Sequence, residues 1–223
     1  MHYVFQFGVV YDNLPLLLHG ALLTIRLSAL AMLFGAVVGV FGAAVSTSGP
    51  RWASGIVRAY VEVIRNTPFL VQLFIIYFSL PAIGLRFRAD QAALLGMTIN
   101  LGAYATEIIR GGIEAIPRGQ IEAGRALGLR RWHIFRFIVL VPALRVVYPA
   151  LVSQFILLML GSSVISSISA EDLTAVTNTL QSTTFRSFEF YFAATAIYFV
   201  MALGFRLVLD GLGWLLFQRR TAA

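Results

Sequence analysis

The stretch that decides the fold runs from residue 110 to residue 142 and reads RGGIEAIPRGQIEAGRALGLRRWHIFRFIVLVP. It carries six arginines against two glutamates and lies between two long apolar runs. A segment with this many charges does not reside in lipid, and its Ala, Leu and Ile content favours a helix over a slack linker. We therefore expect a cytoplasmic helix that presents one face to another protein.

The composition of the whole chain is that of an integral membrane protein, with 59% hydrophobic and 12% charged residues. All 17 cationic Lys or Arg side chains are arginine. A basic chain can bind nucleic acid. In a membrane protein, however, basic residues indicate which loops face the cytoplasm, so we expect no nucleic-acid partner. The lack of cysteine and the scatter of three histidines leave no pattern for a metal site.

Five apolar runs approach the roughly 20 residues that a bilayer-spanning helix needs. They cover residues 27–45, 67–85, 92–109, 137–165 and 190–217. The expected fold is an all-α integral membrane protein of about five transmembrane helices with a short cytoplasmic helix. Residues 16–217 would form a single transmembrane domain, whose cytoplasmic segment is about 111–133. An external or interfacial leader, 1–15, would precede this domain, and a cytoplasmic tail, 218–223, would follow it.

The arginines predict which side of the membrane each loop faces. Eleven fall in residues 46–66, in residues 110–136 and at the C-terminus, whereas only three fall in the loops of the other side. Because cytoplasmic loops carry the excess of positive charge, the N-terminus should face outward and the C-terminus should face the cytoplasm. Residues 161–180, which are rich in Ser and Thr, should form either an external loop or a partly re-entrant element.

Two local patterns predict helix ends and helix packing. Within residues 113–128, Pro117 fits the first helical turn, and Gly128 is placed to end the helix with a positive φ. The small residues of this helix leave room for another backbone to approach closely. Gly35, Gly39 and Gly42 recur at helical spacing in the first span and predict a face that packs against another helix.

The segment GQIEAGRALG, residues 119–128, resembles the EAA loop of ABC importer permeases. Four further blocks resemble one branch of that family, the polar amino-acid permeases. They begin at Gly20-x3-Thr24, at Tyr60-Val-Glu62-x2-Arg65-Asn66-Thr67-Pro68, at Gly102-Ala103-Tyr104-x2-Glu107-x2-Arg110, and at Pro149-x3-Ser153-Gln154, which Asp172-Leu173 follows. Their order is that of the family, and the likeness covers residues 16–217.

This resemblance implies a permease subunit in a bacterial inner membrane. Its partners would be an ABC ATPase dimer, a second permease of identical or sister sequence, an extracytoplasmic solute-binding protein and the membrane lipid. No cofactor is expected in this chain, because ATP and Mg would be bound by the ATPase. The chain has no lysine for a phosphate-binding loop of its own and would be a non-catalytic subunit. The residues that the resemblance assigns to ATPase coupling are Gly119, Gln120, Glu122, Ala123, Gly124 and Gly128.

Two departures from the family pattern bear on the function. The third position of the EAA triplet is Gly124, a small residue in place of another small residue. Leu160-Gly161-Ser162-Ser163 stands where the family often has Lys-Asp-Thr-Ser, so two charges are missing. An amino acid or a related small polar solute is the cargo that the resemblance implies, and basic, neutral and modified amino acids all stay open.

Polar residues inside the spans are candidates for the substrate path, because ionisable and polar groups at membrane depth are costly. Glu107 either meets an ammonium group of a substrate or forms an i,i+3 pair with Arg110. Gln72 and Asn100 either bind a zwitterion or bridge helices, and Ser162 and Ser163 offer hydroxyl groups.

Two other functions fit the composition less well. An intramembrane serine hydrolase would need His133 near Ser163, but the intervening helix places them tens of ångströms apart. A secondary carrier or channel that is not coupled to ATP would not need the GQIEAG helix, and carriers usually contain inverted repeats. It is the alternative to the importer.

Overall fold

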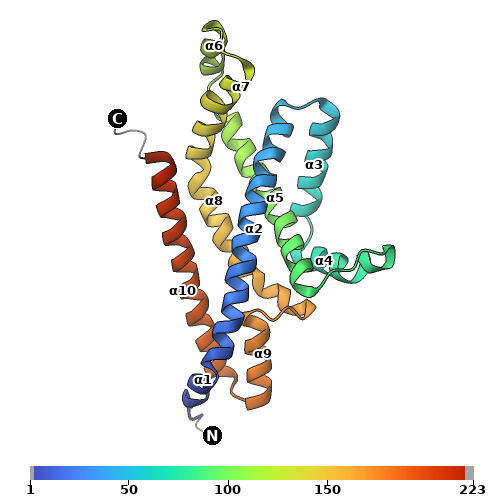
Figure 1. Cartoon of the computed structure of the whole chain (residues 1–223), viewed down its shortest axis with the longest axis vertical. Helices are drawn as coiled ribbons and strands as arrows, with labels where there is room; N and C mark the ends of the chain where they lie inside the picture. The colour runs from blue at the N-terminus through green and yellow to red at the C-terminus, as the bar shows by residue number, and fades with distance from the viewer. Residues whose placement is uncertain (1–2, 219–223) are drawn as a thin grey trace. The chain divides into compact units, whose positions relative to one another are not determined.

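The computed structural model describes residues 3–218, and every element in that range is a helix (Figure 1). The contacts divide the chain into two compact units, and four of the long helices contribute residues to both. Unit 1 comprises residues 3–31, 69–97 and 156–208, and unit 2 comprises residues 32–68, 98–155 and 209–218. Of the predicted tail, 218–223, only residue 218 is described. Arg219 and Arg220, which belong to the arginine count, lie outside the described residues.

Each unit gathers segments that the arginine count assigns to one side. Unit 1 holds the leader, the start of the third predicted span and residues 161–180. Unit 2 holds residues 46–66 and 110–136, the two segments with the most arginine. The grouping of segments therefore agrees with the predicted topology, and the orientation itself stays a prediction.

Four helical stretches are long and apolar enough to cross a membrane, and a broken pair makes a fifth candidate. The four stretches are Leu14–Ser48, Ala89–Glu114, Arg131–Ile168 and Ser187–Phe217. They correspond to α2 (Leu14–Ser48), α5 (Ala89–Glu114), the run from α7 (Arg131–His133) through η3 (Ile134–Leu140) and α8 (Val141–Gly161) to η4 (Ser162–Ile168), and α10 (Ser187–Gly213) with η5 (Trp214–Gln218). The expected all-α membrane fold of about five spans is confirmed.

The second span is not the single apolar helix that the sequence predicts over residues 67–85. The broken pair joins α3 (Arg51–Arg65) to a second piece that starts at Phe69. That piece changes from α-helix (α4, Phe69–Phe74) to π-helix (η1, Ile75–Ser79) and then to 3₁₀-helix (η2, Leu80–Ile83). Pro68 disfavours helical geometry at the residue before it, and Gly84 ends the last turn at a φ of 88°.

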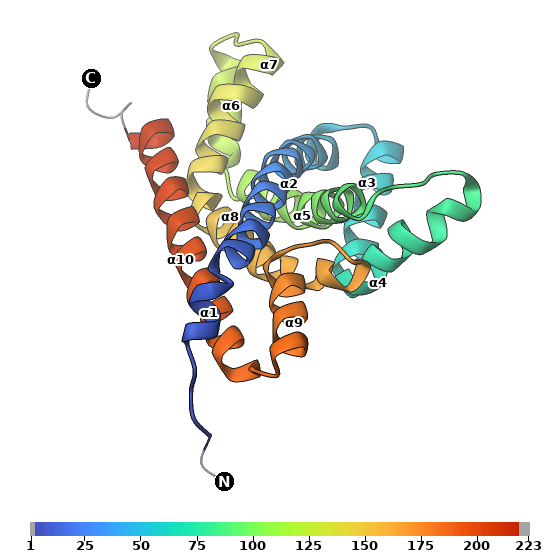
Figure 2. The ribbon, with the colours of Figure 1, turned by 60° about the horizontal axis from the view of Figure 1, so that its bottom comes forward.

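In unit 1, the polar segment 161–180 is mostly helical, and the two forms expected for it, an external loop or a partly re-entrant element, stay predictions. Ser162–Ile168 continues as 3₁₀-helix, a turn follows at Ser169, and α9 (Leu173–Thr184) is a regular helix that lies beside the start of α10 (Figure 2). Ser187 donates a hydrogen bond of 2.8 Å to Gln181, which ties the two helices together. Local bonds from Ser and Thr hydroxyls to the carbonyls one turn earlier satisfy this segment internally.

The leader is held against α10 within unit 1. After α1 (Gly8–Asp12), α2 begins at Leu14, inside the predicted leader. Upstream, the Tyr3 hydroxyl donates to Glu189 Oε2 at 2.5 Å and the Gln6 amide donates to Glu189 Oε1 at 2.9 Å. Arg186 lies 3.8 Å from the same carboxylate, so the charge of the fully buried Glu189 is matched.

In unit 2, the glycine face of α2 packs against α5, as the sequence predicts. A Cβ at Gly35 would meet Leu101 at 2.8 Å, a Cβ at Gly39 would meet the Cβ of Ala105 at 2.5 Å, and a Cβ at Gly42 would collide with Thr106. The absence of side chains therefore lets two backbones approach closely, which is the usual basis of helix association in lipid.

Candidate functional site

The predicted cytoplasmic helix is present as α6 (Arg118–Ala126), preceded by Pro117 in an extended conformation. Gly128 adopts a φ of 70°, which confirms the prediction that it ends the helix. Its amide donates to the Arg125 carbonyl at 2.9 Å, and the Leu129 amide donates to the Gly124 carbonyl at 3.1 Å. These two bonds form a Schellman motif, which satisfies the last carbonyls and fixes where the chain turns.

One residue anchors α6 to the chain itself. Gly124 is buried, and a Cβ there would lie 2.6 Å from Ile138 and 3.3 Å from Ile134, both on η3. The close approach that Gly124 permits is therefore made to η3 of this chain. The other five predicted coupling residues are exposed: Gly119, Gln120, Glu122, Ala123 and Gly128.

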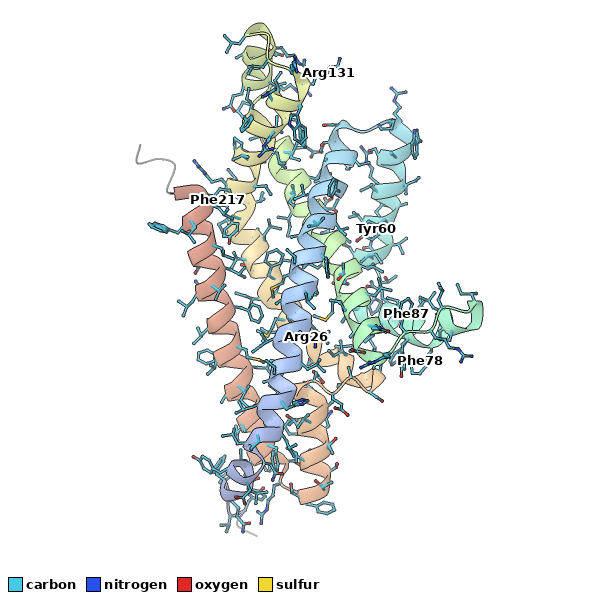
Figure 3. All side chains as sticks on the ribbon, in the orientation of Figure 1. Arg26, Tyr60, Phe78, Phe87, Arg131 and Phe217 are labelled. Carbon is cyan, nitrogen blue, oxygen red and sulfur yellow. The ribbon has the colours of Figure 1, made fainter. Side chains whose placement is uncertain are left out.

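The turn after α6 exposes large apolar side chains. Leu127 is 79% exposed and Trp132 is 60% exposed, and both come after α6 in the sequence. Arg131, which is labelled in Figure 3, is also exposed. Large apolar groups next to arginines are typical of protein-binding surfaces, so this end of unit 2 is suited to dock a partner.

The second and third family-like blocks meet in one cleft of unit 2. This cleft has a volume of about 610 Å³ and is lined by α3 and α5 together with Ser46 of α2. Tyr60, labelled on α3 in Figure 3, donates from its hydroxyl to the Ile99 carbonyl of α5 at 2.6 Å. Arg65 of α3 lies 5.4 Å from the centre of the Tyr104 ring and 3.7 Å from Glu107. The two blocks are thus joined by direct contacts.

Glu107 forms the i,i+3 pair that was one of its two predicted states. Arg110 donates to both carboxylate oxygens, at 3.0 Å and 2.6 Å, and also donates to Glu114 at 2.5 Å. The Arg110 guanidinium therefore links the wall of the cleft to the last residue of α5, next to the segment that leads into α6. A bidentate pair of this kind fixes geometry as well as contributing energy.

We expect Arg110→Gln to slow ATP-driven uptake about fivefold, equivalent to about 1 kcal/mol, because the bidentate pair would be lost and Glu107 would keep only its longer contact with Arg65. Glu114→Gln is the matched control, since it removes the more exposed partner and leaves the bidentate pair intact. Initial uptake rates measure both. Equal losses in the two variants would contradict a specific role for the Arg110–Glu107 pair.

In unit 1, the first and fourth family-like blocks also meet. The Thr24 hydroxyl of α2 accepts a hydrogen bond from the Leu173 amide at 3.2 Å, and a Cβ at Gly20 would touch the Asp172 carbonyl at 3.0 Å. Asp172 caps α9 by accepting from the Ala175 amide at 2.9 Å, and it accepts a longer bond, 3.4 Å, from Tyr198 of α10. Residues about 150 positions apart thereby form one buried junction of three helices.

Burial raises the pKa of the Asp172 carboxyl to about 6, and the hydrogen bonds that it accepts only partly offset this rise. The folded chain therefore binds this proton more tightly than the unfolded chain, in which the pKa is about 3.9. The protonated form of Asp172 adds to the free energy of unfolding, and this contribution is lost as the pH rises from about 4 to about 6. Above about pH 7, little further change in the free energy of unfolding is expected.

From this we expect the thermal unfolding midpoint of the detergent-solubilised chain to fall between pH 5 and pH 7, with Asp172 contributing about 1 kcal/mol or roughly 2–4 °C. Asp172→Asn should remove that contribution, because an amide does not titrate and asparagine still caps a helix well. Scanning fluorimetry of both proteins across this range measures it. The same pH dependence in wild type and variant would show that Asp172 is not responsible.

The candidates for the substrate path are distributed over both units. Ser162 is buried and donates to the Met159 carbonyl at 2.7 Å, and Ser163 follows it at the start of η4. Gln72 is buried on α4, which packs against η4, so these three residues belong to neighbouring elements of unit 1. Asn100 and Glu107 both lie on α5 within unit 2, where only Glu107 lines the cleft described above.

Arg65, Tyr104 and Asp172 lie in the family-like blocks but were not among the site residues predicted from the sequence. The sequence signal that could have identified them was the placement of charged and aromatic residues within those blocks. Pairing of the blocks in space could not be read from their order along the chain. Within residues 3–218, no group of three or more His, Asp or Glu side chains is arranged to hold a metal ion.

Comparisons with known proteins identify chains similar to this one. The glutamine transport system permease protein GlnP of Escherichia coli is 35% identical over 201 residues, which cover 89% of this chain and 92% of that protein. The nopaline transport system permease protein NocM of Agrobacterium fabrum is 35% identical over 218 residues, which cover 93% and 90% of the two chains.

Solved structures give the same result. A crystal structure of an amino acid ABC transporter with histidines matches with a TM-score of 0.85 and 36% identity, covering 95% of this chain and 99% of that chain. The MetNI methionine ABC transporter in an inward-facing conformation matches with a TM-score of 0.78 at 20% identity, which concerns the fold alone. The family described as the binding-protein-dependent transport system inner membrane component matches residues 31–221. This chain therefore belongs to that family and is a permease subunit of an ABC importer.

Proposed function

We propose that this permease carries an amino acid, or a small solute with the same zwitterionic head group, across the bacterial inner membrane. The relatives in the comparison are named for glutamine and nopaline, and the matched crystal structure is that of an amino acid transporter. These solutes share an α-amino acid head group, which makes the head group the best-supported feature of the cargo. Gln72, Asn100, Glu107, Ser162 and Ser163 stay the proposed substrate path.

The proposed assembly has two permease chains, identical or sister, on an ABC ATPase dimer, with a solute-binding protein outside. ATP and Mg would be held by the ATPase dimer. Large apolar side chains stay exposed along α2, among them Leu33 and Phe41, and a second permease or lipid would cover them. The proposed orientation, with the N-terminus outside and the C-terminus in the cytoplasm, is supported by the arginine excess in the segments of unit 2.

The observation that carries the coupling proposal is the fixed yet exposed position of α6. Gly124 packs this helix against η3, and the Schellman motif at Gly128 fixes its end. Gln120, Glu122 and Ala123 are then exposed on a helix that packs directly against η3, at the start of the span that follows it. A partner that pulls on α6 would therefore transmit force to η3 and α8, which is what nucleotide-driven gating requires.

Reconstitution tests the proposal. The permease, its cognate ATPase and its binding protein are placed in proteoliposomes, and uptake of radiolabelled L-glutamine, L-arginine and L-alanine is followed with ATP or without it. We expect uptake of at least one amino acid that depends on ATP, on the ATPase and on the binding protein. Equal uptake without ATP would instead identify a secondary carrier or a channel.

A further inference from the structure

Unit 1 contains a second polar cleft, about 490 Å³ in volume, that no part of the mechanism above uses. It is formed by one stripe of α2, by the start of α5 and by the turn that precedes α9. Its polar lining consists of His19, Arg26, Arg88, Asp90, Ser169 and Glu171. Its volume lies within the range of about 300–1,000 Å³ that is usual for small-molecule sites.

Charges of both signs line this cleft, and they are not equally paired. Arg88 lies 3.3 Å from Asp90, so these two neutralise each other. Arg26 and Glu171, in contrast, have no ion-pair or hydrogen-bond partner for their side chains anywhere in residues 3–218. The cleft therefore presents one free guanidinium and one free carboxylate, on α2 and on the turn before α9.

Arg26 stands where α2 meets its apolar run. It is exposed on α2 at the residue before residues 27–45, so its unpaired guanidinium lies at the edge of the apolar stretch and not within it. Lining a polar cleft gives the guanidinium access to water in the isolated chain. An anionic group that entered the cleft would gain a bidentate partner there.

We propose that this cleft binds the zwitterionic head group of an amino acid, with Arg26 holding the carboxylate and Glu171 holding the ammonium group. The start of α5, where Ala89 and Asp90 line the cleft, adds the positive end of a long helix to the lining of the cleft. This proposal rests on the proposed function and places one substrate contact in segments that the arginine count assigns to the outside. It would be where the solute first meets the permease.

The test uses the natural absence of cysteine from the chain. Ser169→Cys places one thiol in the cleft, and Ser182→Cys places one on the exposed face of α9 as the matched control. The rate of alkylation by a membrane-impermeant maleimide is measured on the permease–ATPase complex in nanodiscs. Millimolar L-glutamine, L-alanine or L-arginine is added, and so are two glutamine analogues, 4-carbamoylbutanoate without the ammonium group and 4-aminobutanamide without the carboxylate.

The amino acids should slow labelling of Ser169→Cys about threefold, as when a ligand is present at about twice its Kd, and neither analogue should match them. Adding Arg26→Gln or Glu171→Gln should abolish the protection, while Ser182→Cys should label at one rate throughout. No protection by any of the three amino acids, or protection that survives both neutral substitutions, would overturn the proposal. Protection by the ligand-free binding protein alone would also overturn it, since the cleft would then be a docking socket for that protein.

Failure of this proposal is distinguishable from failure of the proposed function. ATP-dependent uptake by the wild-type assembly tests the function and needs no labelling. If uptake occurs while the cleft shows no amino-acid protection, only the cleft assignment falls. If the wild-type assembly shows no ATP-dependent uptake of any amino acid, the proposed function falls, whatever the labelling gives.

Discussion

Reversing the charge at Glu122 should reduce ATP-driven uptake to the background of liposomes without permease. Glu122 is exposed on α6, whose backbone is fixed by Gly124 and Gly128, so Glu122→Arg changes the docking face without a change in packing. A like charge or an unpaired charge in a protein interface costs several kcal/mol, and a loss of about 4 kcal/mol would weaken docking roughly a thousandfold. Uptake and the amount of protein inserted in the membrane are measured on the same preparations.

Arg51→Glu is the matched control, because it also reverses an exposed charge but lies on a different helix, at the first residue of α3. It should insert equally well and should retain most of the uptake. Normal uptake by Glu122→Arg, or an equal loss in both variants, would show that the docking face of α6 has no special part in driving transport.

Gly39→Leu should strongly destabilise the folded chain. Even a single Cβ at Gly39 would lie 2.5 Å from the Cβ of Ala105 and 3.1 Å from its backbone carbon, so α2 and α5 would have to separate within unit 2. Overpacking of this kind costs about 3 kcal/mol or more, against a total stability of about 5–15 kcal/mol. Fluorescence-detected size-exclusion chromatography of the solubilised variant should show loss of the monodisperse peak.

Gly55→Leu serves as the comparison for that experiment. Gly55 lies on α3, where a Cβ would meet nothing within 4 Å, so the same substitution should leave the elution profile unchanged. If Gly39→Leu elutes as wild type does, the glycine face of α2 is not the close helix contact that the structure describes.

The features that were predictable from the sequence are those that depend on local geometry. Gly128 ends α6 because a positive φ is cheapest for glycine, and that requirement is visible in one residue. The Gly35, Gly39 and Gly42 face follows from helical periodicity, which needs no knowledge of the partner helix. The number of spans follows likewise from lengths of apolar sequence.

The features that the sequence did not reveal depend on competition between helix types and on packing. Residues 67–85 are apolar enough for one span, but hydropathy does not report the change from α-helix to π-helix and 3₁₀-helix. Residues 161–180 are rich in Ser and Thr and too polar for lipid, which predicted an external loop or a partly re-entrant element and not a regular helix. Bonds from Ser and Thr hydroxyls to nearby carbonyls nonetheless satisfy these residues within η4 and α9.

The candidate site was predictable residue by residue but not as an arrangement. For Glu107, the sequence predicted either a contact with the substrate or an ion pair with Arg110. Both partners are within reach of the carboxylate, so the structure is needed to identify the pair with Arg110. The junction around Asp172 brings together residues that are far apart in the sequence. So does the cleft of unit 1, with its two unpaired charges, Arg26 and Glu171. Linear spacing carries no information on such contacts.

The central claim, that α6 receives force from an ATPase, is tested most directly by cross-linking. Ala123→Cys introduces one thiol on the exposed face of α6 in a chain that has no other, and Ser182→Cys on α9 serves as the control. With a photoactivatable reagent on each thiol, Ala123→Cys should yield a permease–ATPase product whose amount changes with nucleotide, and Ser182→Cys should yield none. Absence of that product from Ala123→Cys, in a complex where the ATPase is present, would contradict the account.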